Sequence, residues 1–267
     1  MTFSIATWNI NSVRLRIELV VRYLSQHQPD VLCLQETKCP DANFPFGAFR
    51  DAGYPHIAIN GQKGYHGVAI VSRIPFMSFS RRDFCAKGDA RHLHVVLGGE
   101  PGLELHNFYV PAGGDEPDPK INVKFAHKLA FVGEMSDWAR QEKPGARRSI
   151  LVGDLNIAPL EHDVWSHKSL LGVVSHTPIE VDKLKRAQAA GQWFDALRKF
   201  VPDDQKLYTW WSYRSPDWAK ANKGRRLDHI WVSPSLAGAV SETRVLRDAR
   251  GWQRPSDHVP VMARLAL

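Results

Sequence analysis

Asp154 and Asn156 stand two positions apart where the apolar stretch ILVGDLNIAP, residues 150–159, turns polar. Side chains alternate along a strand, so a strand through this stretch would point both residues to the same side. Asp and Asn also favour turns, because they hydrogen-bond their own backbone, and taken alone the stretch is more typical of a turn. As a site, it would bring a carboxylate and a carboxamide to one edge of the fold. Gly153 would then let backbone or substrate come close.

Other polar side chains also stand at the ends of apolar runs. Asn9 follows the run FSIATW, Glu36 follows VLCLQ, and Tyr109 stands near the end of LELHNFYV. Asp257 and His258 instead come just before VPVMARL, the last apolar run of the chain. If these ends share one rim of the molecule, the last strand must run opposite to the others, which a mixed sheet allows.

Such a rim suits phosphoester hydrolysis. Carboxylate and amide oxygens are hard ligands fit for Mg²⁺, and a bound metal neutralises charge on a phosphoryl oxygen. A further carboxylate or an imidazole can deprotonate a water, while Asn, Tyr and protonated His can donate hydrogen bonds to the oxygens of the phosphorane. This chemistry needs no Ser or Cys nucleophile with a flanking elbow, and the sequence contains none.

Each of these residues also has a structural interpretation. Glu36 could be a surface residue at a strand end, Tyr109 could pack in the core, and the segment 256–258 could be an ordinary loop. Asp228 could be a strand-edge charge paired with one of the arginines at 225–226. The coincidence of all these groups at strand ends favours a catalytic rim over any of the separate interpretations.

The segment WWSYRSPDWAKANKGRR, residues 210–226, interleaves aromatic and basic side chains. Such a pattern can stack on nucleobases or sugars and hold phosphates. Aromatic residues are also ordinary core residues, and Trp210 or Trp211 could equally be packed inside. The segment therefore indicates nucleic-acid contact only in combination with the rim.

Composition indicates a soluble globular protein, with 43% hydrophobic and 24% charged residues among 267. The absence of a Pro/Gly/Ser-rich linker and of internal repeats favours a single domain over residues 1–267. The net charge of +7 suits a polyanionic partner. Cys33, Cys39 and Cys85 lack metal-type spacing and, without a signal peptide, predict reduced thiols in the cytoplasm. Apolar runs fall short of the roughly 20 residues that a membrane helix needs.

The strands and helices that must position the rim alternate in the first part of the chain, and pairs of strands joined by short links follow in the later part. Apolar runs and periodicity predict strands at 3–8, 31–34, 67–72, 92–97, 103–110, 149–153, 207–213, 227–233, 241–247 and 259–265. Helices are predicted at 13–24, capped by Asn11 or Ser12, and at 121–141, 181–190 and 193–200. The mixture favours an α/β protein with mixed sheets covered by helices.

At this point the motifs resemble a known family. The motifs are TWNINSVR (7–14), LCLQETK (32–38), GVAIVSR (67–73), YVP (109–111), GDLNIAP (153–159), RRLDHIWVS (225–233) and SDHVPV (256–261). Their order and spacing resemble the exonuclease III class of DNA repair nucleases, within the endonuclease/exonuclease/phosphatase superfamily. The resemblance covers nearly the whole chain, and it is specific in combination although each motif alone is weak.

The resemblance implies a four-layer α/β sandwich, with two mixed β-sheets packed face to face and flanked by helices. It implies Mg²⁺-dependent hydrolysis, with Mn²⁺ as a substitute, on double-stranded DNA with abasic sites or recessed or blocked 3′ ends. The implied activities are abasic-site (AP) endonuclease, 3′-5′ exonuclease and 3′-phosphatase in base excision repair. We expect a monomer in the cytoplasm, associated with the nucleoid in a prokaryote-like setting, and no membrane partner.

The resemblance also implies roles for residues at matching positions. Metal binding is implied for Asn9, Glu36, Asp154, Asn156, Asp257 and His258. Catalytic roles are implied for Tyr109, Asp154, Asn156, Asp228 and His258. In these roles Asp154 activates the water, His258 contacts the phosphate and Asp228 holds His258, although a His–Asp pair could be the base instead. DNA contacts are expected at Arg73, Trp211, Arg214 and Lys223.

Two departures from the family pattern bear on specificity. Ala112-Gly113-Gly114-Asp115 follows Tyr-Val-Pro, where abasic-site endonucleases of the family often place an amide side chain. A phosphate-contacting amide is thereby lost and an acid gained. Asn11-Ser12 also stands where many members have Asn-Gly or Asp-Gly. These departures leave the balance of the three activities open.

Two further hypotheses remain. One is an inositol-phosphate phosphatase or phospholipid phosphodiesterase of the same superfamily, which a basic charge also suits. The other is a non-catalytic DNA-binding module, which would be expected to lose metal ligands. The aromatic and basic segment at 210–226 and the LQETK motif favour the DNA enzyme over both.

Overall fold

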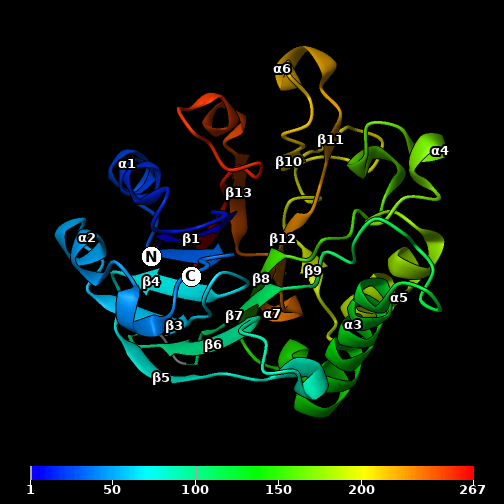
Figure 1. Ribbon diagram of the computed structural model, residues 1–267. Helices are drawn as coiled ribbons and strands as arrows, with labels where there is room; N and C mark the ends of the chain where they lie inside the picture. The colour runs from blue at the N-terminus through cyan, green and yellow to red at the C-terminus, as the bar shows by residue number, and fades with distance from the viewer. Residues whose placement is uncertain (1, 100–101) are drawn as a thin grey trace.

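The computed structural model describes residues 2–99 and 102–267 and contains two six-stranded sheets that face each other (Figure 1). The first sheet has the order β13-β14-β1-β2-β4-β3. Its strands are β1 (Thr2–Asn9), β2 (Val31–Gln35), β3 (His56–Asn60), β4 (Val68–Ser72), β13 (Val240–Val245) and β14 (Val261–Ala266). Only β1 and β2 pair in parallel in this sheet. It is therefore a mixed sheet.

The second sheet has the order β5-β6-β7-β8-β12-β9, with β7 and β8 as its parallel pair. Its strands are β5 (Phe76–Ser80), β6 (His92–Leu97), β7 (Glu104–Tyr109), β8 (Ser149–Asp154), β9 (Phe194–Asp195) and β12 (Asp228–Val232). A separate two-stranded ribbon joins β10 (Trp210–Trp211) to β11 (Gly224–Arg225).

Helices α1 (Ile17–His27) and α2 (Phe46–Asp51) cover the outer face of the first sheet, and α3 (Val123–Glu142) and α5 (Pro178–Ala190) cover that of the second. The short helices α4 (His167–Leu170), α6 (Trp218–Ala221) and α7 (Pro234–Ala237) lie in connecting segments. One apolar cluster fills the space between the sheets, a second joins the first sheet to α1 and α2, and a third joins the second sheet to α3 and α5. These layers confirm the predicted four-layer α/β sandwich with two mixed sheets.

The strand directions produce the predicted rim. β14 runs antiparallel to β1, with Thr7 opposite Val261, so the segment just before β14 lies beside the end of β1. β12 runs antiparallel to β8 and places Asp228 directly opposite Asp154. The expectation that the last strand runs opposite to its neighbour is confirmed.

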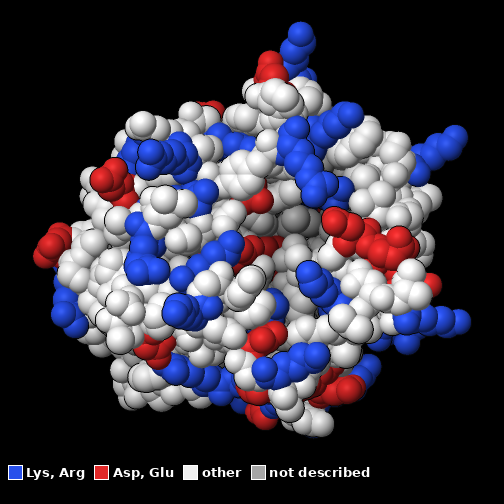
Figure 2. Space-filling model, in the orientation of Figure 1, with Lys and Arg blue, Asp and Glu red and all other residues white. Residues whose placement is uncertain are grey.

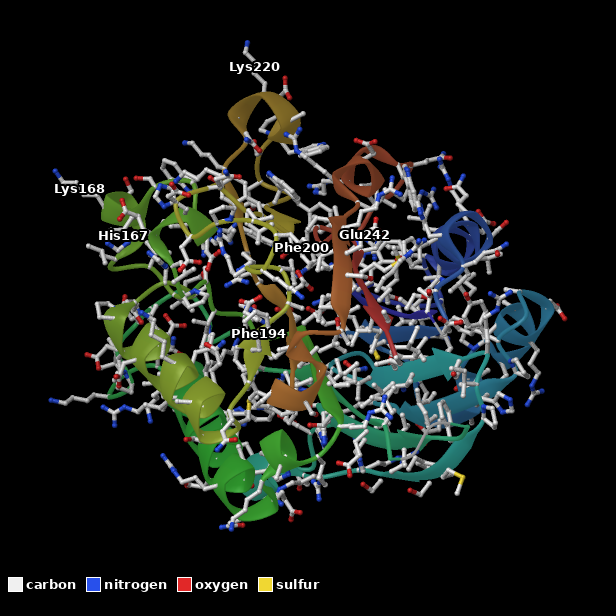
Figure 3. The ribbon with its side chains drawn as sticks, turned by 180° about the vertical axis from the view of Figure 1, so that it is seen from behind. His167, Lys168, Phe194, Phe200, Lys220 and Glu242 are labelled. Carbon is white, nitrogen blue, oxygen red and sulfur yellow. The ribbon has the colours of Figure 1, made fainter. Side chains whose placement is uncertain are left out.

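Several element predictions were wrong. The segment 193–200 is not a helix, because Phe194 and Asp195 form the edge strand β9 against β12 (Figure 3) and turns follow them. Only Trp210–Trp211 of the expected strand 207–213 is extended and paired. Helix α1 begins at Ile17, and its N-cap residue Arg16 makes no side-chain cap, so Asn11 and Ser12 lie before the helix and do not cap it.

Buried hydrogen bonds of Gln35 and Asn107 connect the two sheets next to the rim. Gln35 and Asn107 are fully buried, and Gln35 Nε2 donates to Asn107 Oδ1 at 2.7 Å. Asn107 Nδ2 donates to the carbonyl oxygens of Leu34 and Ala69 in the opposite sheet, at 3.0 Å each. Because Gln35 precedes Glu36, this link fixes the spacing between the two halves of the site.

Gly153 has the close backbone approach that the sequence predicts. Its φ is +143°, and a Cβ atom there would overlap the carbonyl oxygen of Phe108 on the neighbouring strand β7. A larger residue would push β8 away from β7 and displace Asp154 and Tyr109 relative to each other. Among the described residues, the helices are too short or too polar to cross a membrane.

Candidate active site

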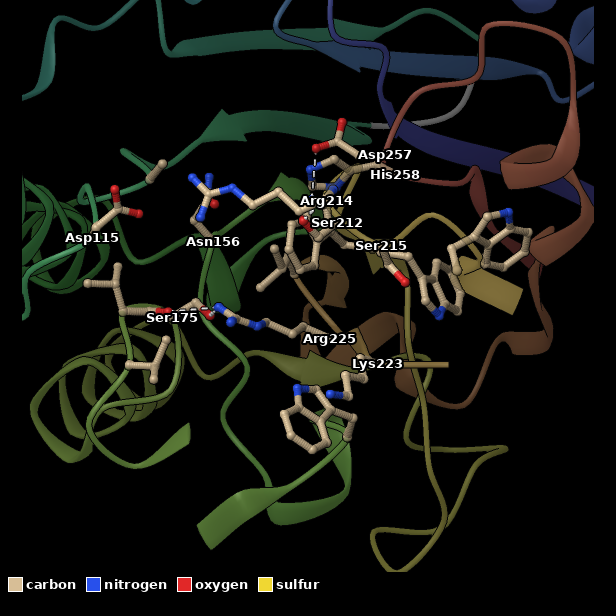
Figure 4. Close-up of a pocket in the computed structure, with 18 of the residues that line it drawn as sticks. Asp115, Asn156, Ser175, Ser212, Arg214, Ser215, Lys223, Arg225, Asp257 and His258 are labelled. Atoms are coloured by element: carbon tan, nitrogen blue, oxygen red, sulfur yellow. Dashed lines mark hydrogen bonds between the residues drawn. The ribbon is translucent and has the colours of Figure 1, made fainter. Parts of the chain in front are cut away.

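The rim residues converge at one edge of the facing sheets. Asn9 ends β1, Glu36 follows β2, Tyr109 ends β7, Asp154 ends β8 and Asp228 begins β12. Asn156, Asp257 and His258 join them from the segments after β8 and before β14. The seven side chains predicted for the rim therefore lie at the same edge together with Asp228, and Figure 4 shows Asn156, Asp257 and His258 at the cavity.

Asn9 joins the two central carboxylates. Its Nδ2 donates to Asp154 Oδ2 at 2.8 Å and to Glu36 Oε1 at 2.9 Å. Asn156 also contacts Asp154, through its backbone N–H to Oδ1 at 2.9 Å and its Nδ2 to Oδ2 at 3.1 Å. The structure thus combines both interpretations of GDLN, since the turn that Asn156 makes holds the carboxylate of Asp154.

Glu36 and Asn156 both adopt the left-handed backbone conformation, with φ of 50° and 53°. Such angles are uncommon outside glycine and cluster at functional sites, where the surrounding structure holds them. The backbone N–H of Ser12 donates to the Glu36 carbonyl oxygen at 2.7 Å, and Lys38 Nζ pairs with Glu36 Oε2 at 2.9 Å. These contacts hold the Glu36 carboxylate towards Asp154.

His258 lies between two carboxylates. Its Nδ1 is 2.8 Å from Asp228 Oδ2, and its Nε2 is 3.6 Å from Asp154 Oδ2. The Thr209 hydroxyl donates to Asp228 Oδ2 at 2.6 Å, which fixes that carboxylate. The alternative in which Asp228 pairs with a neighbouring arginine is wrong, because Arg226 instead binds Asp163 and Asp195.

Burial and mutual electrostatic interactions shift the pKa values of Asp154 and His258. Burial, together with the nearby Asp228 and Glu36 carboxylates and against the opposing effect of His258, raises the pKa of Asp154 to about 7. Burial would lower the pKa of His258, but Asp228 and Asp154 together raise it to about 10. At neutral pH the imidazole is therefore a cation, while Asp154 is close to its own pKa.

Asp257 is held at the rim by an indole. Its Oδ2 accepts from Trp210 Nε1 at 2.9 Å, and its Oδ1 accepts from Asn11 Nδ2 at 3.2 Å. Trp210 therefore orients an acidic group of the site.

The carboxylates fit a metal ion. Glu36 and Asp154 share one amide donor, and burial together with the negative neighbours disfavours the charged form of Asp154. A cation between them would remove that penalty. Asp154, Asp228 and His258 also offer donor atoms within 4.8 Å of one another. The site thus has a candidate set of metal ligands.

Comparison with known proteins agrees with this geometry. Residues 6–258 match the Endonuclease/Exonuclease/phosphatase family. The chain belongs to this family. It is 30% identical to "Exodeoxyribonuclease III" of Haemophilus influenzae, over 96% of this chain and 97% of that protein. The family expected from the motifs is confirmed.

Solved structures of the same fold match the chain over nearly its whole length. An AP endonuclease from Archaeoglobus fulgidus superposes with a TM-score of 0.91 at 29% identity, covering 99% of this chain and all of that one. A 3′-5′ exonuclease (NExo) from Neisseria meningitidis superposes with a TM-score of 0.90 at 31% identity, with the same coverage.

The family site opens into a cavity of about 790 Å³. Glu36, Asp257 and His258 line its acidic end, and aromatic and basic side chains line the rest. Figure 2 shows acidic atoms in a hollow at the middle of this face, with Lys and Arg on the surface around it. Basic side chains around an acidic hollow produce a surface potential that attracts polyanions.

Three of the four expected DNA contacts line the cavity, and the fourth, Arg73, does not. Arg214 and Lys223 line the cavity, and Lys223 Nζ lies 4.6 Å from the Trp165 ring centroid (Figure 4). Trp211 also lines the cavity, but it is only 2% exposed because its ring packs with Ala249 and Val259. The segment 210–226 extends to α6, where Lys220 points away from the molecule (Figure 3).

The structure places Arg73 away from the rim. β4 runs antiparallel to β2, and Ser72 pairs with Val31 at the beginning of β2. Arg73 therefore lies at the edge of the sheet opposite to the rim, where its backbone N–H donates to the Asp30 carbonyl oxygen. The motif GVAIVSR contributes a core strand to the site, and its arginine lies elsewhere.

The sequence analysis missed two supporting groups. Lys128 is fully buried in α3 and donates to the Asn156 carbonyl oxygen at 2.8 Å, while its charge pairs with Glu180 at 2.5 Å. Arg91 stacks over the Tyr109 ring at 4.9 Å. Neither stands at the end of an apolar run, so the pattern that found the rim could not find them.

We expect Asp228→Asn to lower the pKa of His258 from about 10 by at least about two units. The change removes the negative charge closest to the imidazole, and burial then favours the neutral ring. Nuclear magnetic resonance titration of the metal-free protein should show His258 protonated between pH 6 and 8 in the wild type and titrating in the variant. The raised pKa stabilises the folded wild type below about pH 6.5, and this contribution disappears as pH rises through about 10. An unchanged titration would contradict the assigned pairing.

Proposed function

We propose that the protein is a metal-dependent DNA repair nuclease that hydrolyses phosphodiesters by water attack at abasic sites, 3′ ends or both. The observation that carries this proposal is the single cavity in which Glu36 and His258 lie beside Arg214, Lys223 and aromatic side chains. The names of its relatives, exodeoxyribonuclease III, AP endonuclease and 3′-5′ exonuclease, support it.

Asp154 would accept the proton of the attacking water. Its pKa of about 7 is close to the working pH, where a general base combines sufficient basicity with a large ionised fraction. The amides of Asn9 and Asn156 fix the direction of its oxygens, and Asn156 would also orient the water. The proton could then pass to the leaving oxygen.

His258 and Tyr109 would hold the phosphate. The protonated imidazole presents Nε2 towards Asp154, while Asp228 occupies Nδ1 and sets the orientation of the ring. Burial and then Glu36 and Asp154 raise the pKa of Tyr109 well above its ordinary value, so its hydroxyl remains a donor. Two donors fixed before the reaction would stabilise charge that develops on the phosphoryl oxygens.

Mg²⁺, with Mn²⁺ as a substitute, is the metal that the donor set fits best. Glu36 and Asp154 would provide carboxylates, with Asn9, Asn156, Asp257 and His258 nearby. Mg²⁺ uses few protein carboxylates and keeps several waters. When bound, it would neutralise charge on the phosphate and on the leaving oxygen.

The test is a duplex that carries one abasic-site analogue and a 5′ label, incubated with Mg²⁺ or EDTA. A parallel set compares a 3′-phosphate end and an undamaged recessed 3′ end. We expect cleavage or trimming only with Mg²⁺. Hydrolysis of inositol phosphates or phospholipids without action on DNA would favour the alternative activity within the superfamily.

The balance of activities depends on the loop after Tyr109. Asp115 lines the cavity and is exposed, three residues after Ala112, which stands where abasic-site endonucleases of the family often carry an amide. Its negative charge faces the space that a DNA backbone would occupy. We propose that this loop disfavours abasic-site incision relative to work at 3′ ends.

Asp115→Asn should therefore tighten binding to abasic duplex DNA by about threefold to tenfold, because one repulsive charge is removed near the phosphates. Fluorescence anisotropy with EDTA measures this change, and its size should shrink as salt is raised. Glu116→Gln is the matched control, since Glu116 is exposed but does not line the cavity. Equal effects of both variants would mean that net charge alone is responsible.

We also propose that residues 1–267 form one domain, because the main core cluster draws its residues from both sheets. The expected partner is double-stranded DNA bound by a monomer. The three cysteines are free, which supports a cytoplasmic, nucleoid-associated protein.

A further inference from the structure

A second group of metal-ligating side chains lies away from the rim. His94 on β6 pairs directly with His106 on β7, and Glu104 stands two residues before His106 on the same face of the strand. Trp138 of α3 packs edge-on against the His106 ring at 4.9 Å, so the group faces the helix layer. We call these three residues, His94, Glu104 and His106, the β6–β7 triad.

The donor atoms of the triad converge without other partners. His94 Nε2 is 3.7 Å and His106 Nε2 is 3.8 Å from the same oxygen, Glu104 Oε2. These distances are too long for hydrogen bonds. Among the described residues, none of the three atoms has a hydrogen-bond partner, although each is buried. Unpartnered polar atoms in a buried position are costly and call for an explanation.

The other polar atom of each side chain does have a partner. Ser80 Oγ is 3.3 Å from His94 Nδ1, His92 Nε2 is 3.3 Å from His106 Nδ1, and Arg147 Nε is 3.1 Å from Glu104 Oε1. In metal sites the histidine nitrogen that does not bind the metal is typically held in this way, which fixes the tautomer and the ring direction. The supporting contacts therefore leave the three converging atoms as the free ligand atoms.

We propose that the β6–β7 triad is a second metal site, which binds Zn²⁺ or a similar borderline divalent cation. Two imidazoles and one carboxylate are a known zinc donor set, and donors in a tetrahedral zinc site lie about 3.4 Å apart. The triad is within a few tenths of an ångström of that spacing for the two pairs that include Glu104. The imidazole planes are stacked at 14°, so binding requires the two rings to tilt towards the ion.

The state of the histidines suits this role. Burial lowers the pKa of His94 to about 4 and lowers that of His106, so both rings are neutral at pH 7 and can donate a lone pair. His94 keeps 20% of its side chain exposed, which leaves a path for the ion and for a water as fourth ligand.

The triad and the rim are separate sites. Glu104 begins β7 and Tyr109 ends it, and the two side chains point to opposite faces because they are five residues apart. An ion at the triad would join β6 to β7 and stabilise the sheet beneath α3. It would not take part in hydrolysis.

Equilibrium dialysis of the full chain against Zn²⁺, with excess Mg²⁺ present to occupy the oxygen-rich rim, tests this proposal. The wild type should bind one Zn²⁺, and diffraction at the zinc absorption edge should place the ion between the three donor atoms. His94→Ala and Glu104→Gln should each weaken this binding by at least about 100-fold. Both variants should keep the Mg²⁺-dependent nuclease rate, which separates failure of this proposal from failure of the proposed function.

His56→Ala is the matched control, because His56 is a half-buried histidine on β3 outside the triad. Zn²⁺ should also raise the midpoint of thermal unfolding in the wild type and in His56→Ala, but not in Glu104→Gln. Glu104→Gln keeps the shape of the side chain, so Zn²⁺ binding can be tested with this variant if His94→Ala folds poorly. Equal Zn²⁺ binding by wild type and triad variants, or zinc located only at the rim, would overturn the proposal.

Discussion

Asp154→Asn is expected to reduce the rate of phosphodiester hydrolysis by about 10³-fold or more while leaving DNA binding intact. Removal of a positioned general base costs roughly 10²–10⁴-fold, and Asp154 is also a candidate metal ligand. The amide is nearly isosteric with the carboxylate, so the cavity keeps its shape. Single-turnover cleavage of the abasic duplex with saturating Mg²⁺ measures the chemical step, and anisotropy with EDTA measures binding.

The same variant makes an independent prediction about stability. The folded-state pKa of Asp154, about 7, lies above the ordinary value of 3.8, so the carboxylate destabilises the metal-free fold and the loss grows as pH rises from about 4 through 7. Asp154→Asn should therefore raise the unfolding temperature in EDTA at pH 8 and have little effect at pH 4. A rate close to that of the wild type would transfer the role of base to the His258–Asp228 pair.

Glu36→Gln is the second variant with a large expected effect. It should raise the Mg²⁺ concentration for half-maximal cleavage by about 100-fold, because one of the two carboxylates that face the metal position loses its charge. The amide still reaches Asn9 and Lys38 but no longer attracts a divalent cation. A titration of cleavage rate against Mg²⁺, repeated with Mn²⁺, measures the effect.

Glu18→Gln provides the matched control, because Glu18 is an exposed residue of α1 with the same change of charge. It should leave the Mg²⁺ dependence unchanged. A Glu36→Gln enzyme that is slow at every Mg²⁺ concentration, with an unaltered half-maximal value, would show that Glu36 acts on the chemical step instead of on metal binding.

The predictions from sequence succeeded where a local pattern and a chain direction were sufficient. Polar residues at the ends of apolar strands must lie at a sheet edge, and this reasoning located Asn9, Glu36 and Asp154 together. It failed for 193–200, where pairing with β12 makes a short edge strand of residues that have helical spacing. It did not indicate that Arg73 lies away from the rim, because the sequence does not specify that β4 runs antiparallel to β2.

The sequence by itself determined the inventory of the rim and the family, since motif order and residue type do not depend on how the sheets pack. Only the tertiary structure determined which charged groups of the site lie next to each other, and therefore their protonation states. Asp228 Oδ2 lies 2.8 Å from His258 Nδ1, although the two residues are 30 positions apart in the sequence, and pairing of β12 with β8 places Asp228 opposite Asp154. The pairing of Lys128 with Glu180 and the convergence of His94 with His106 depend in the same way on contacts between elements. Electrostatic interactions and metal coordination act over a few ångströms in space, and the distance along the chain does not report that separation.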